Sequence, residues 1–505
     1  MTVPPEQAAT AALLTALAGA APVETHISAV FLGADTVWKL RKAVKLAFVD
    51  FTTLAERERT ARRELELNAA NAPGLYRDVV PVIRRPDGTH ALGDGGEVVD
   101  WVVRMARVPP GDFLDEVAAR GALDGPLLDA PLLDAPLLDA MADAVVALHA
   151  GNPVVPRDQH AALGQVADGN ALAARQAGLN PAEIAAWRTG MQAQLDRHAG
   201  TLRTRGATGF VRRCHGDLHL GNMCLWHGAP VAFDALEFDE ALATIDIGYD
   251  LAFLLMDLDQ RVDRAAANRV MNRYLARTGD WGLVPLLPLW LSMRAMVRAH
   301  VEAARGHPAE SRRYLDHALA SLAPAFACAV AIGGLPGSGK STVARALAPK
   351  LGAAPGAVIL RSDEIRKRRF GLAPEQKLGQ NGYTKAASEA VFAEIAQAAH
   401  GIAAGGHCVI ADATYMDPAH RARLEAALDG LPFLGVWLDV PLPELERRVA
   451  ARTGDASDAD LAILRRTARA GASAGTWLAV DGTDTNQAAA TMRASLAIRS
   501  PKAHI

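Results

Sequence analysis

A stretch well past the middle of the chain has the residue types and spacing of a phosphate-binding loop. Residues 334–341 fill the pattern G-x-x-x-x-G-K-[ST], directly after a run that favours a strand and before one that favours a helix. Glycines let backbone N–H groups turn toward phosphate oxygens, and the N-terminus of the next helix adds positive potential. The pattern predicts a nucleotide site made of Gly334, Gly337, Ser338, Gly339, Lys340, Ser341 and Thr342.

Two carboxylates extend this predicted site. Lys340 is expected to reach the β- and γ-phosphates, and Ser341 to hold Mg²⁺. Asp363 follows VILRS and Asp412 follows CVIA, so both should lie at the C-terminal edge of a parallel sheet, where such folds bind ligands. One carboxylate would order the metal while the other accepts a proton from an attacking hydroxyl. Helix capping is the structural alternative for either acid.

Arginines follow in two segments of the same region. Arg366 comes three residues after Asp363 in RSDEIRKRRF, and LERRVAAR places Arg448 and Arg452 one helical turn apart. Arginines so placed could close over a phosphoryl group in transfer. The alternative is a solvated basic helix.

The segments GLPGSGKST, RSDEIRKR, VIADATYMDPAHR and RVAARTGDASDAD resemble the small P-loop kinases of the AAA_33 type. These are akin to domains that phosphorylate polynucleotide 5′ ends and, more distantly, to gluconate and adenylylsulfate kinases. The resemblance spans most of residues 327–482. It implies that Asp363 is the base, that Arg366 contacts the substrate, and that Arg448 and Arg452 form a lid, which leaves the metal to Asp412. The acceptor stays open because these relatives use very different hydroxyls.

A second set of kinase residues lies much earlier, in RRCHGDLHLGNMCLW. Phosphoryl transfer needs a carboxylate at the acceptor hydroxyl, an amide oxygen on the metal and a second carboxylate that joins Mg²⁺ to the phosphates. Asp217, Asn222 five residues later and Asp234 in VAFDALEFD supply these three groups. The neighbouring His215 and His219 are expected to shape the loop.

This loop resembles the catalytic loop of aminoglycoside phosphotransferases and of choline or fructosamine kinases, which carry H-G-D-x-x-x-x-N followed by a strand-borne Asp. The resemblance covers roughly residues 20–320. It implies that Lys39 in TVWKL pairs with the α- and β-phosphates and that Glu64 is its ion-pair partner. Lys42 and Glu66 are the rival residues for these two roles.

Three more features of the first half follow from the same resemblance. The phosphate-covering turn would be ETHIS, residues 24–28, although it lacks glycines. WVVRMAR would form the hinge whose backbone contacts the purine, around Met105 to Arg107. Asp246 and Asp250 are predicted to lie four residues apart on one helix face beneath the catalytic loop, with a structural role.

The elements that must position these residues change in type along the chain. Residues 23–107 favour short strands, interrupted by one helix over about 53–70. Residues 111–322 favour long helices, and from residue 327 strands and helices alternate, as in a parallel sheet covered by helices on both faces. We therefore predict a bilobal protein-kinase-like fold followed by an α/β/α P-loop domain: a β-rich lobe (1–110), a helical lobe (111–322) and the P-loop domain (323–505).

Composition limits the classes of protein. The 505 residues are 50% hydrophobic and carry a formal net charge of -3, so no global field favours nucleic acid or an anionic membrane. Four cysteines without CxxC spacing indicate a reducing cytoplasm and no structural zinc.

The N-terminal run AALLTALAGAA has no basic residue before it and favours an amphipathic helix over a signal peptide. WGLVPLLPLWLSM is too short to cross a bilayer and favours a buried helix pair. PLLDAPLLDAPLLDA, three copies of five residues, is interpreted as a local duplication.

Together the two residue sets predict an enzyme with two phosphotransferase sites that use ATP, with GTP as the alternative nucleotide, and Mg²⁺. Small metabolites with hydroxyl groups are the expected acceptors. The alternatives are a nucleic-acid 5′-hydroxyl kinase in the P-loop half, for which RKRRF is the basic candidate segment, or a regulatory nucleotide-binding module in one half. Antibiotic resistance is disfavoured because the first half is not markedly acidic. Neither the acceptors nor the oligomeric state follow from the sequence.

Overall fold

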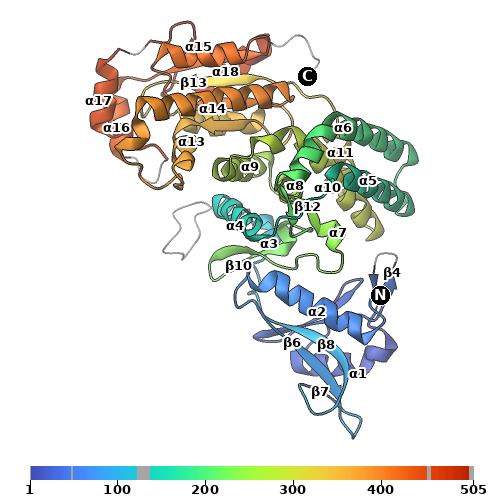
Figure 1. Cartoon of the computed structure of the whole chain (residues 1–505). Coiled ribbons are helices and arrows are strands. Elements are labelled where there is room, and N and C mark those ends of the chain that lie inside the picture. Colours follow the sequence, from blue (N-terminus) through green and yellow to red (C-terminus); the bar gives the residue numbers. More distant parts are fainter. Residues whose placement is uncertain (1, 47–48, 122–136, 452–455, 472, 500–505) are drawn as a thin grey trace. The chain divides into compact units, whose positions relative to one another are not determined.

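The computed structural model of the protein describes every residue except 1, 47–48, 122–136, 452–455, 472 and 500–505 (Figure 1). It comprises two compact units. Unit 1 contains residues 1–159 and 203–251, and unit 2 contains residues 160–202 and 252–505. The predicted domain boundaries after residues 110 and 322 stay predictions. The predicted helical lobe, residues 111–322, contributes residues to both compact units. Most of the PLLDA repeat lies outside the described residues.

Unit 1 contains a six-stranded antiparallel sheet in the order β1-β2-β3-β8-β6-β7. The helix α2 (Leu54–Ala69) comes after β3 and a short hairpin, is capped by Thr53, and packs against β6 and β8. The strands are β1 (Val23–Glu24), β2 (Ser28–Leu32), β3 (Thr36–Arg41), β6 (Tyr76–Arg84), β7 (His90–Leu92) and β8 (Glu97–Ala106), with a separate short hairpin of β4 (Lys45–Leu46) and β5 (Val49–Asp50).

The N-terminal apolar run forms a helix, as the sequence predicts. After a short 3-10 helix (Pro5–Gln7), α1 (Ala8–Ala18) buries Leu14 completely in a core that includes Phe31 of β2 and Leu40 of β3. Alternation along β2 and β3 turns these apolar side chains to one face of the sheet. The helix is therefore part of the packing of this sheet.

The rest of unit 1 frames the predicted catalytic loop. Residues 214–222 join β9 to β10, and Asp234 comes two residues after β11, which forms a hairpin with β10. The strand β9 pairs with β12, so both ends of the loop are tied to short ladders. These elements are α3 (Leu114–Ala119), α4 (Leu137–Gly151), β9 (Val211–Arg213), a 3-10 turn (Leu220–Asn222), β10 (Met223–Trp226), β11 (Ala229–Ala232), α7 (Glu240–Ala243) and β12 (Thr244–Asp246).

Most of the long helices belong to unit 2. The segment predicted as a buried helix pair, WGLVPLLPLWLSM, forms a 3-10 helix (Trp281–Leu286) and then the first turns of a single buried helix, α10. Trp187 donates to Ser292 Oγ at 3.0 Å inside this core. The helices are α5 (Gln159–Gln176), α6 (Pro181–Ala207), α8 (Ile247–Arg261), α9 (Arg264–Thr278), α10 (Leu287–Ala304) and α11 (Pro308–Ser321). Among the described residues, no helix combines the length and apolar character that a membrane span requires.

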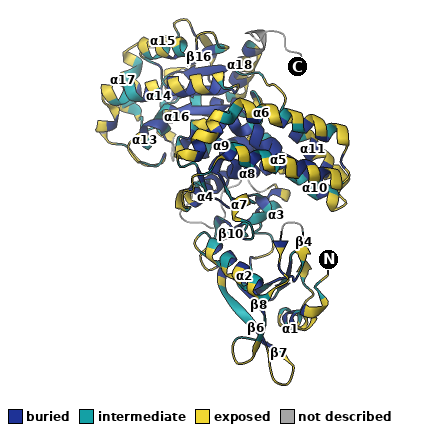
Figure 2. Cartoon of the chain, turned by 45° about the vertical axis from the view of Figure 1, so that its right-hand side comes forward, coloured by how far each residue is buried: buried dark blue, intermediate teal, exposed yellow. Residues whose placement is uncertain are grey.

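The C-terminal part of unit 2 is built on a five-stranded parallel sheet in the order β14-β15-β13-β16-β17. All five predicted strands are present, and the three central ones are almost wholly buried (Figure 2). Val330 and Ile332 of β13 pack with Val343 of α12 and Met492 of α18. The strands are β13 (Ala329–Gly333), β14 (Val358–Arg361), β15 (Val409–Asp412), β16 (Phe433–Asp439) and β17 (Leu478–Asp481).

Helices follow each strand of this sheet, so strands and helices alternate as predicted. They are α12 (Lys340–Leu347), a 3-10 turn (Ala348–Lys350), α13 (Ser362–Arg369), a 3-10 turn (Gln380–Tyr383), α14 (Lys385–Ala404), α15 (Pro418–Ala427), α16 (Leu442–Ala451), α17 (Leu461–Arg469) and α18 (Thr485–Arg499). The carboxyl ends of β13, β14 and β15 meet at one edge of the sheet, where parallel α/β folds bind ligands.

Candidate active sites

In unit 1, the strand β3 and the helix α2 bring a lysine and a glutamate together. Lys39 Nζ lies 2.7 Å from Glu64 Oε1 and 2.5 Å from Asp234 Oδ1. Burial alone would lower the pKa of Lys39, but Asp234 and Glu64 raise it above its usual value. Burial likewise opposes ionisation of Asp234, whose pKa is nevertheless lowered by Lys39 and Arg41. The three predicted residues thus form one charged cluster, in which Lys39 and Glu64 are largely buried and the Asp234 side chain is 40% exposed.

The rival residues have other partners. Lys42 is fully buried, where its ammonium contacts Glu24 Oε2 at 2.6 Å and donates to the Thr25 carbonyl at 2.7 Å. Glu66 is 69% exposed and pairs with Arg63. The geometry therefore favours Lys39 and Glu64 for the phosphate-binding pair, because only they lie beside Asp234.

The catalytic loop holds Asp217 and Asn222 side by side. Asn222 Nδ2 donates to the Asp217 carbonyl and to Asp217 Oδ2, both at 2.9 Å, which leaves the amide oxygen as the atom suited to a metal. The Asp217 side chain is 43% exposed, so an acceptor could reach it. The Phe233 N–H donates to the Asn222 carbonyl at 3.0 Å, which ties this loop to the segment that carries Asp234.

His215 is a buried, neutral support of the loop. Burial lowers its pKa, although Asp250 raises it. Its Nε2 lies 2.8 Å from the Phe233 carbonyl, and its Nδ1 accepts from the Asp217 N–H at 3.4 Å, which assigns the proton to Nε2. The next residue, Gly216, has φ +85°, and a Cβ there would lie 3.1 Å from the side chain of Leu236, so glycine is required.

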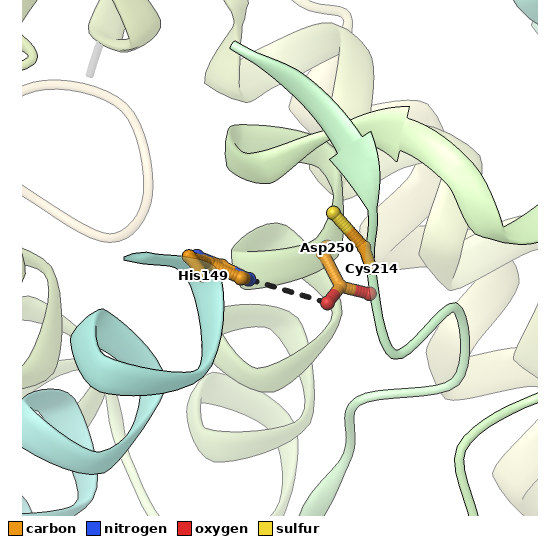
Figure 3. A group of neighbouring side chains, drawn as sticks. All are labelled: His149, Cys214 and Asp250. Atoms are coloured by element: carbon orange, nitrogen blue, oxygen red, sulfur yellow. Dashed lines mark hydrogen bonds and ion pairs between the residues drawn. The ribbon is translucent and has the colours of Figure 1, made fainter. Parts of the chain in front are cut away.

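Asp250 of α8 fixes the start of the same loop. Its carboxylate accepts the backbone N–H groups of His215 at 3.0 Å and of Gly216 at 2.9 Å, and lies 3.2 Å from His149 Nε2. Figure 3 shows His149 and Asp250 pointing toward each other with Cys214 beside them. These donor atoms are close enough for a metal, but the carboxylate already binds backbone and the Cys214 thiol lies 3.4 Å from the Ile245 carbonyl. The group serves as a hydrogen-bonded anchor.

Asp246 is not on the same helix face as Asp250, which corrects the predicted spacing. It is the last residue of β12, and its Oδ1 accepts the Gly248 N–H at 2.8 Å in the first turn of α8. Arg205 contacts both of its oxygens, at 2.7 and 2.9 Å, and neither side chain is exposed beyond 4%. The capping position takes Asp246 out of the helix, and its role is structural, as expected.

Arg41 and Glu237 belong to the charged cluster although the motif analysis assigned them no catalytic role. Arg41 Nη2 lies 2.7 Å from Glu64 Oε2 and also contacts Glu237. Burial raises the pKa of Glu237 to about 7, although Arg41 lowers it and Glu64 adds to the rise. Arg41 comes two residues after Lys39 on a strand, so the period of two already placed both side chains on one face.

The predicted hinge lies at the end of β8. Met105 is still within the sheet, paired with Val37 and Tyr76, whereas Arg107 follows the strand and donates from its backbone N–H to the Asp35 carbonyl at 3.2 Å. A hollow of about 440 Å³ lies here, lined by Ala34, Asp35, Arg77, Ala106, Arg107, Pro109, Pro110 and Trp226. A purine contact from residues 105–107 stays a prediction, with Arg107 the better placed of the two.

The predicted phosphate-covering turn joins β1 to β2. Thr25 Oγ1 accepts the backbone N–H groups of Ser28 at 3.0 Å and of Ile27 at 3.4 Å. A threonine side chain therefore closes a turn that in glycine-rich loops depends on backbone freedom.

In unit 2, the loop after β13 has the geometry of a phosphate cradle. Gly334, Gly337 and Gly339 have φ values of 146°, 84° and 86°. A Cβ on Gly334 would lie 2.7 Å from Ser338 Oγ and 3.0 Å from the Leu438 carbonyl, which excludes any other residue there. Lys340 Nζ donates to the Gly334 and Leu335 carbonyls at 3.0 Å, so its ammonium lies over the loop. Ser338 Oγ is buried without a hydrogen-bond partner among the described residues.

Ser341 and Asp412, the two predicted metal ligands of this site, lie in contact. Ser341 Oγ donates to Asp412 Oδ2 at 2.6 Å, and β15 places this carboxylate directly beside the loop because it pairs with β13. Arg361, which the motif analysis did not single out, lies with Nε 3.4 Å from the same oxygen. A hydroxyl and a carboxylate in contact are suited to Mg²⁺, which binds oxygen ligands.

Asp363 is the second residue of α13 and lines the cleft beside the loop. Burial raises its pKa; Arg361 opposes this rise, whereas Asp412 adds to it. A carboxylate whose pKa is raised is a better proton acceptor than an ordinary aspartate. Arg366, one turn later, is 6% exposed, donates to the Gly382 carbonyl at 2.7 Å and stacks over the Tyr383 ring at 5.0 Å. Its Nε has no hydrogen-bond partner among the described residues.

The predicted lid lies on the other side of the cleft. Arg448 of α16 donates to Glu444 Oε1 at 2.6 Å and to the Gly482 carbonyl at 3.0 Å; Arg452 lies outside the described residues. The cleft has a volume of about 1380 Å³. Its lining includes the predicted residues Gly337, Gly339, Lys340, Ser341, Thr342, Asp363, Arg366, Asp412 and Arg448.

The basic segment RKRRF does not form a groove of free cations. Lys367 is 1% exposed and pairs with Asp458 at 3.0 Å. Arg368 and Arg369 both pair with Glu394. This segment therefore gives no support to a nucleic-acid-binding surface.

Residues 330–472 match the AAA_33 family model, described as an AAA domain. Over the length of the chain, uncharacterised proteins of Mycobacterium tuberculosis and Mycobacterium bovis are 29% identical across 477 residues, which is 87% of this chain and 88% of each relative. The similarity thus includes both the kinase-like half and the P-loop half.

Solved structures resemble each half separately. A gluconokinase from Sinorhizobium meliloti is 21% identical and covers 35% of this chain and 99% of its own, with a TM-score of 0.26. Aminoglycoside phosphotransferase APH(4)-Ia is 12% identical and covers 62% of this chain and 98% of its own, with a TM-score of 0.39. A glucosamine kinase is 20% identical and covers 61% and 82%, with a TM-score of 0.34.

The family match lies on the predicted P-loop domain of the AAA_33 type; the aminoglycoside phosphotransferase-like character of the first half stays a prediction. The predicted order of elements is observed as well: an antiparallel sheet with the helix α2 comes first, long helices follow, and the parallel sheet of the AAA_33 match comes last.

Proposed function

We propose that the protein is a bifunctional phosphotransferase with one site in each unit, and that each site transfers the γ-phosphoryl group of ATP, with GTP as the alternative donor, to a hydroxyl of a small metabolite. One observation carries this proposal. Each unit brings together a lysine for phosphates, an oxygen pair for Mg²⁺ and a further carboxylate for the acceptor. A regulatory module without turnover would not need that last carboxylate.

In unit 1, Asp217 orients the acceptor hydroxyl and takes its proton as its oxygen bonds to the γ-phosphorus and the bond from that phosphorus to the bridging oxygen breaks, with ADP as the leaving group. Asn222 and Asp234 hold Mg²⁺, which supplies positive charge beside the phosphates when bound. Lys39 binds phosphate oxygens, and Glu64 keeps its ammonium in place from α2. On nucleotide binding, Lys39 exchanges its contact with Asp234 for phosphate oxygens, which frees that carboxylate for the metal.

In unit 2, backbone N–H groups of the loop and Lys340 hold the β- and γ-phosphates, and Ser341 with Asp412 holds Mg²⁺. Asp363 accepts the proton of the attacking hydroxyl, helped by its raised pKa. Arg366 contacts the acceptor, and Arg448 covers the transferring group from α16. The two catalytic aspartates therefore perform the same task in unrelated folds.

A small molecule is the favoured acceptor in both sites. Solved structures with some similarity include a gluconokinase, a glucosamine kinase and a choline/ethanolamine kinase family protein. Their names suggest a sugar acid, an amino sugar or an amino alcohol as the acceptor to test. A nucleic-acid 5′ end is disfavoured for the P-loop site because the cations of RKRRF are paired or buried.

The test compares the wild-type chain with Asp217→Ala and Lys340→Ala. Each protein receives ATP labelled at the γ-phosphate, Mg²⁺, and a panel of D-gluconate, glucosamine, choline, kanamycin, a 5′-hydroxyl oligonucleotide and a cytoplasmic metabolite extract. The labelled products are then resolved. We expect labelled small molecules, at least one lost in each variant.

The pattern of losses distinguishes the outcomes. A product lost in both variants would mean that the two sites act in sequence on one compound, whereas separate losses would mean two independent kinases. If wild type labels the oligonucleotide and Lys340→Ala does not, the acceptor of the P-loop site is a nucleic acid and not a small metabolite. Products that survive both substitutions would overturn the proposal.

A further inference from the structure

The strand that leads to Asp363 lies at an open edge of the P-loop sheet. The strand order places β14 outermost, paired on one side with β15 alone. The outer side of such a strand presents backbone N–H and C=O groups that need partners. In unit 2 these partners come from α9, a helix that lies outside the AAA_33 match.

Two asparagines of α9 bind this edge. Asn272 Oδ1 accepts the Ile359 N–H at 2.7 Å. The Ala357 carbonyl accepts from Asn268 Nδ2 at 3.0 Å and from Asn272 Nδ2 at 3.2 Å. A carboxamide offers a donor and an acceptor in one plane, as a peptide group does. Asn272 therefore takes the place of a residue in a neighbouring strand.

The same helix also holds the chain beyond Asp363. Arg368, near the end of α13, donates from Nη1 to the Ala276 carbonyl of α9 at 3.1 Å and stacks over the Trp281 ring at 5.2 Å. The segment from Ile359 to Arg368 is thus fastened at both ends to one helix. Asp363 lies between the two attachment points.

We propose that Asn272 is a positioning residue of the P-loop site and that α9 is part of the scaffold of that site, although it precedes the P-loop domain in the sequence. The role of Asp363 as base rests on the proposed function. The attachment of residues 359–368 to α9 does not depend on that function. Asn272 touches neither nucleotide nor acceptor and acts through β14. The P-loop site of this chain therefore depends on a helix that lies outside the P-loop domain.

The first experiment measures deuterium uptake of the full-length chain in peptides covering residues 358–369. Asn272→Leu removes the hydrogen bonds of Asn272 to Ile359 in β14 and to Ala357 just before it, and leaves the Ile359 N–H without that acceptor. We expect exchange of these amides to become at least tenfold faster, while residues 334–342 keep the protection that ATP with Mg²⁺ gives them. Thr278→Ala is the matched control on α9, because its hydroxyl bonds the Tyr274 carbonyl of the same helix; it should exchange as wild type does.

Arg368→Met tests the other attachment point independently and should also accelerate exchange in residues 358–369. Unchanged uptake in both variants would refute the attachment. Uptake raised equally throughout unit 2 would mean general unfolding and would also overturn the proposal.

A kinetic experiment tests the catalytic consequence on an acceptor from the panel. Asn272→Leu should lower kcat roughly 10- to 100-fold, as expected when a catalytic group is displaced by about 1 Å, while KM for ATP changes less than twofold. In an Asp363→Asn background the same substitution should cost nothing further. A full additional loss there would show that Asn272 does not act through Asp363. If no acceptor is turned over, the proposed function fails while the exchange result still decides the attachment.

Discussion

Replacing Lys39 by methionine separates the two candidate lysines of unit 1. Methionine keeps much of the apolar length of the side chain but removes the ammonium that lies 2.7 Å from Glu64 and 2.5 Å from Asp234. The matched variant is Lys42→Met, which removes a fully buried ammonium just after the end of β3 that contacts Glu24 instead. Only the first substitution should abolish phosphoryl transfer by unit 1.

The size of the effect follows from the contacts. At an effective dielectric constant of about 20, unit charges 2.7 Å apart attract by about 6 kcal/mol, most of which offsets desolvation. Breaking a buried pair costs about 3–5 kcal/mol, and we expect about 3 because Arg41 still pairs with Glu64. For a unit of this size that lowers Tm by about 6–12 °C. Loss of charge-assisted hydrogen bonds to phosphates should lower kcat/KM roughly 100-fold or more.

Lys42→Met should behave differently. Its partner Glu24 is 30% exposed and can be hydrated once the ammonium is gone, so the cost should be about 1 kcal/mol. Transfer should stay within about threefold of wild type.

The assay follows transfer of label from ATP by unit 1 in a Lys340→Ala background, at a temperature where circular dichroism shows both variants folded. Thermal unfolding is measured in parallel. Wild-type kcat/KM in Lys39→Met, or a larger loss in Lys42→Met, would refute the assignment of the phosphate-binding lysine.

Three further outcomes are expected. Asp363→Asn should lower kcat of the P-loop site about 100-fold or more. In wild type, kcat should fall as pH falls through the raised pKa of Asp363, because the protonated carboxyl accepts no proton. This fall in kcat at low pH should be absent in the variant. Asp412→Asn should raise the Mg²⁺ concentration for half-maximal P-loop activity at least tenfold, and an unchanged Mg²⁺ titration would count against the Ser341–Asp412 pair. Asp250→Ala should lower the free energy of unfolding of unit 1 by about 3 kcal/mol, since it leaves the buried N–H groups of His215 and Gly216 without that acceptor. Chemical denaturation measures this free energy, and a decrease below about 1 kcal/mol would contradict the anchoring role.

Local sequence was sufficient for the residues that act within one loop or at the end of one strand. Short sequence spacings define the loop that ends at Lys340 and the pair of Asp217 and Asn222. The residues that form each pattern therefore also lie together in the structure. The strands of both sheets followed from β-branched and apolar runs. Asp246 was misplaced because a residue that ends a strand and caps a helix has the same spacing to Asp250 as one inside that helix.

Contacts between distant segments required the tertiary structure. The sequence predicted two phosphate-binding sites, their order along the chain and most of their carboxylates, because each predicted site depends on residues close together. It could not show that Arg41 meets Glu237, 196 residues later, or that Asn272 completes the edge of the sheet that leads to Asp363. Such pairs are selected when apolar faces pack and buried polar groups must find partners, and that requirement acts across the fold, not along the chain.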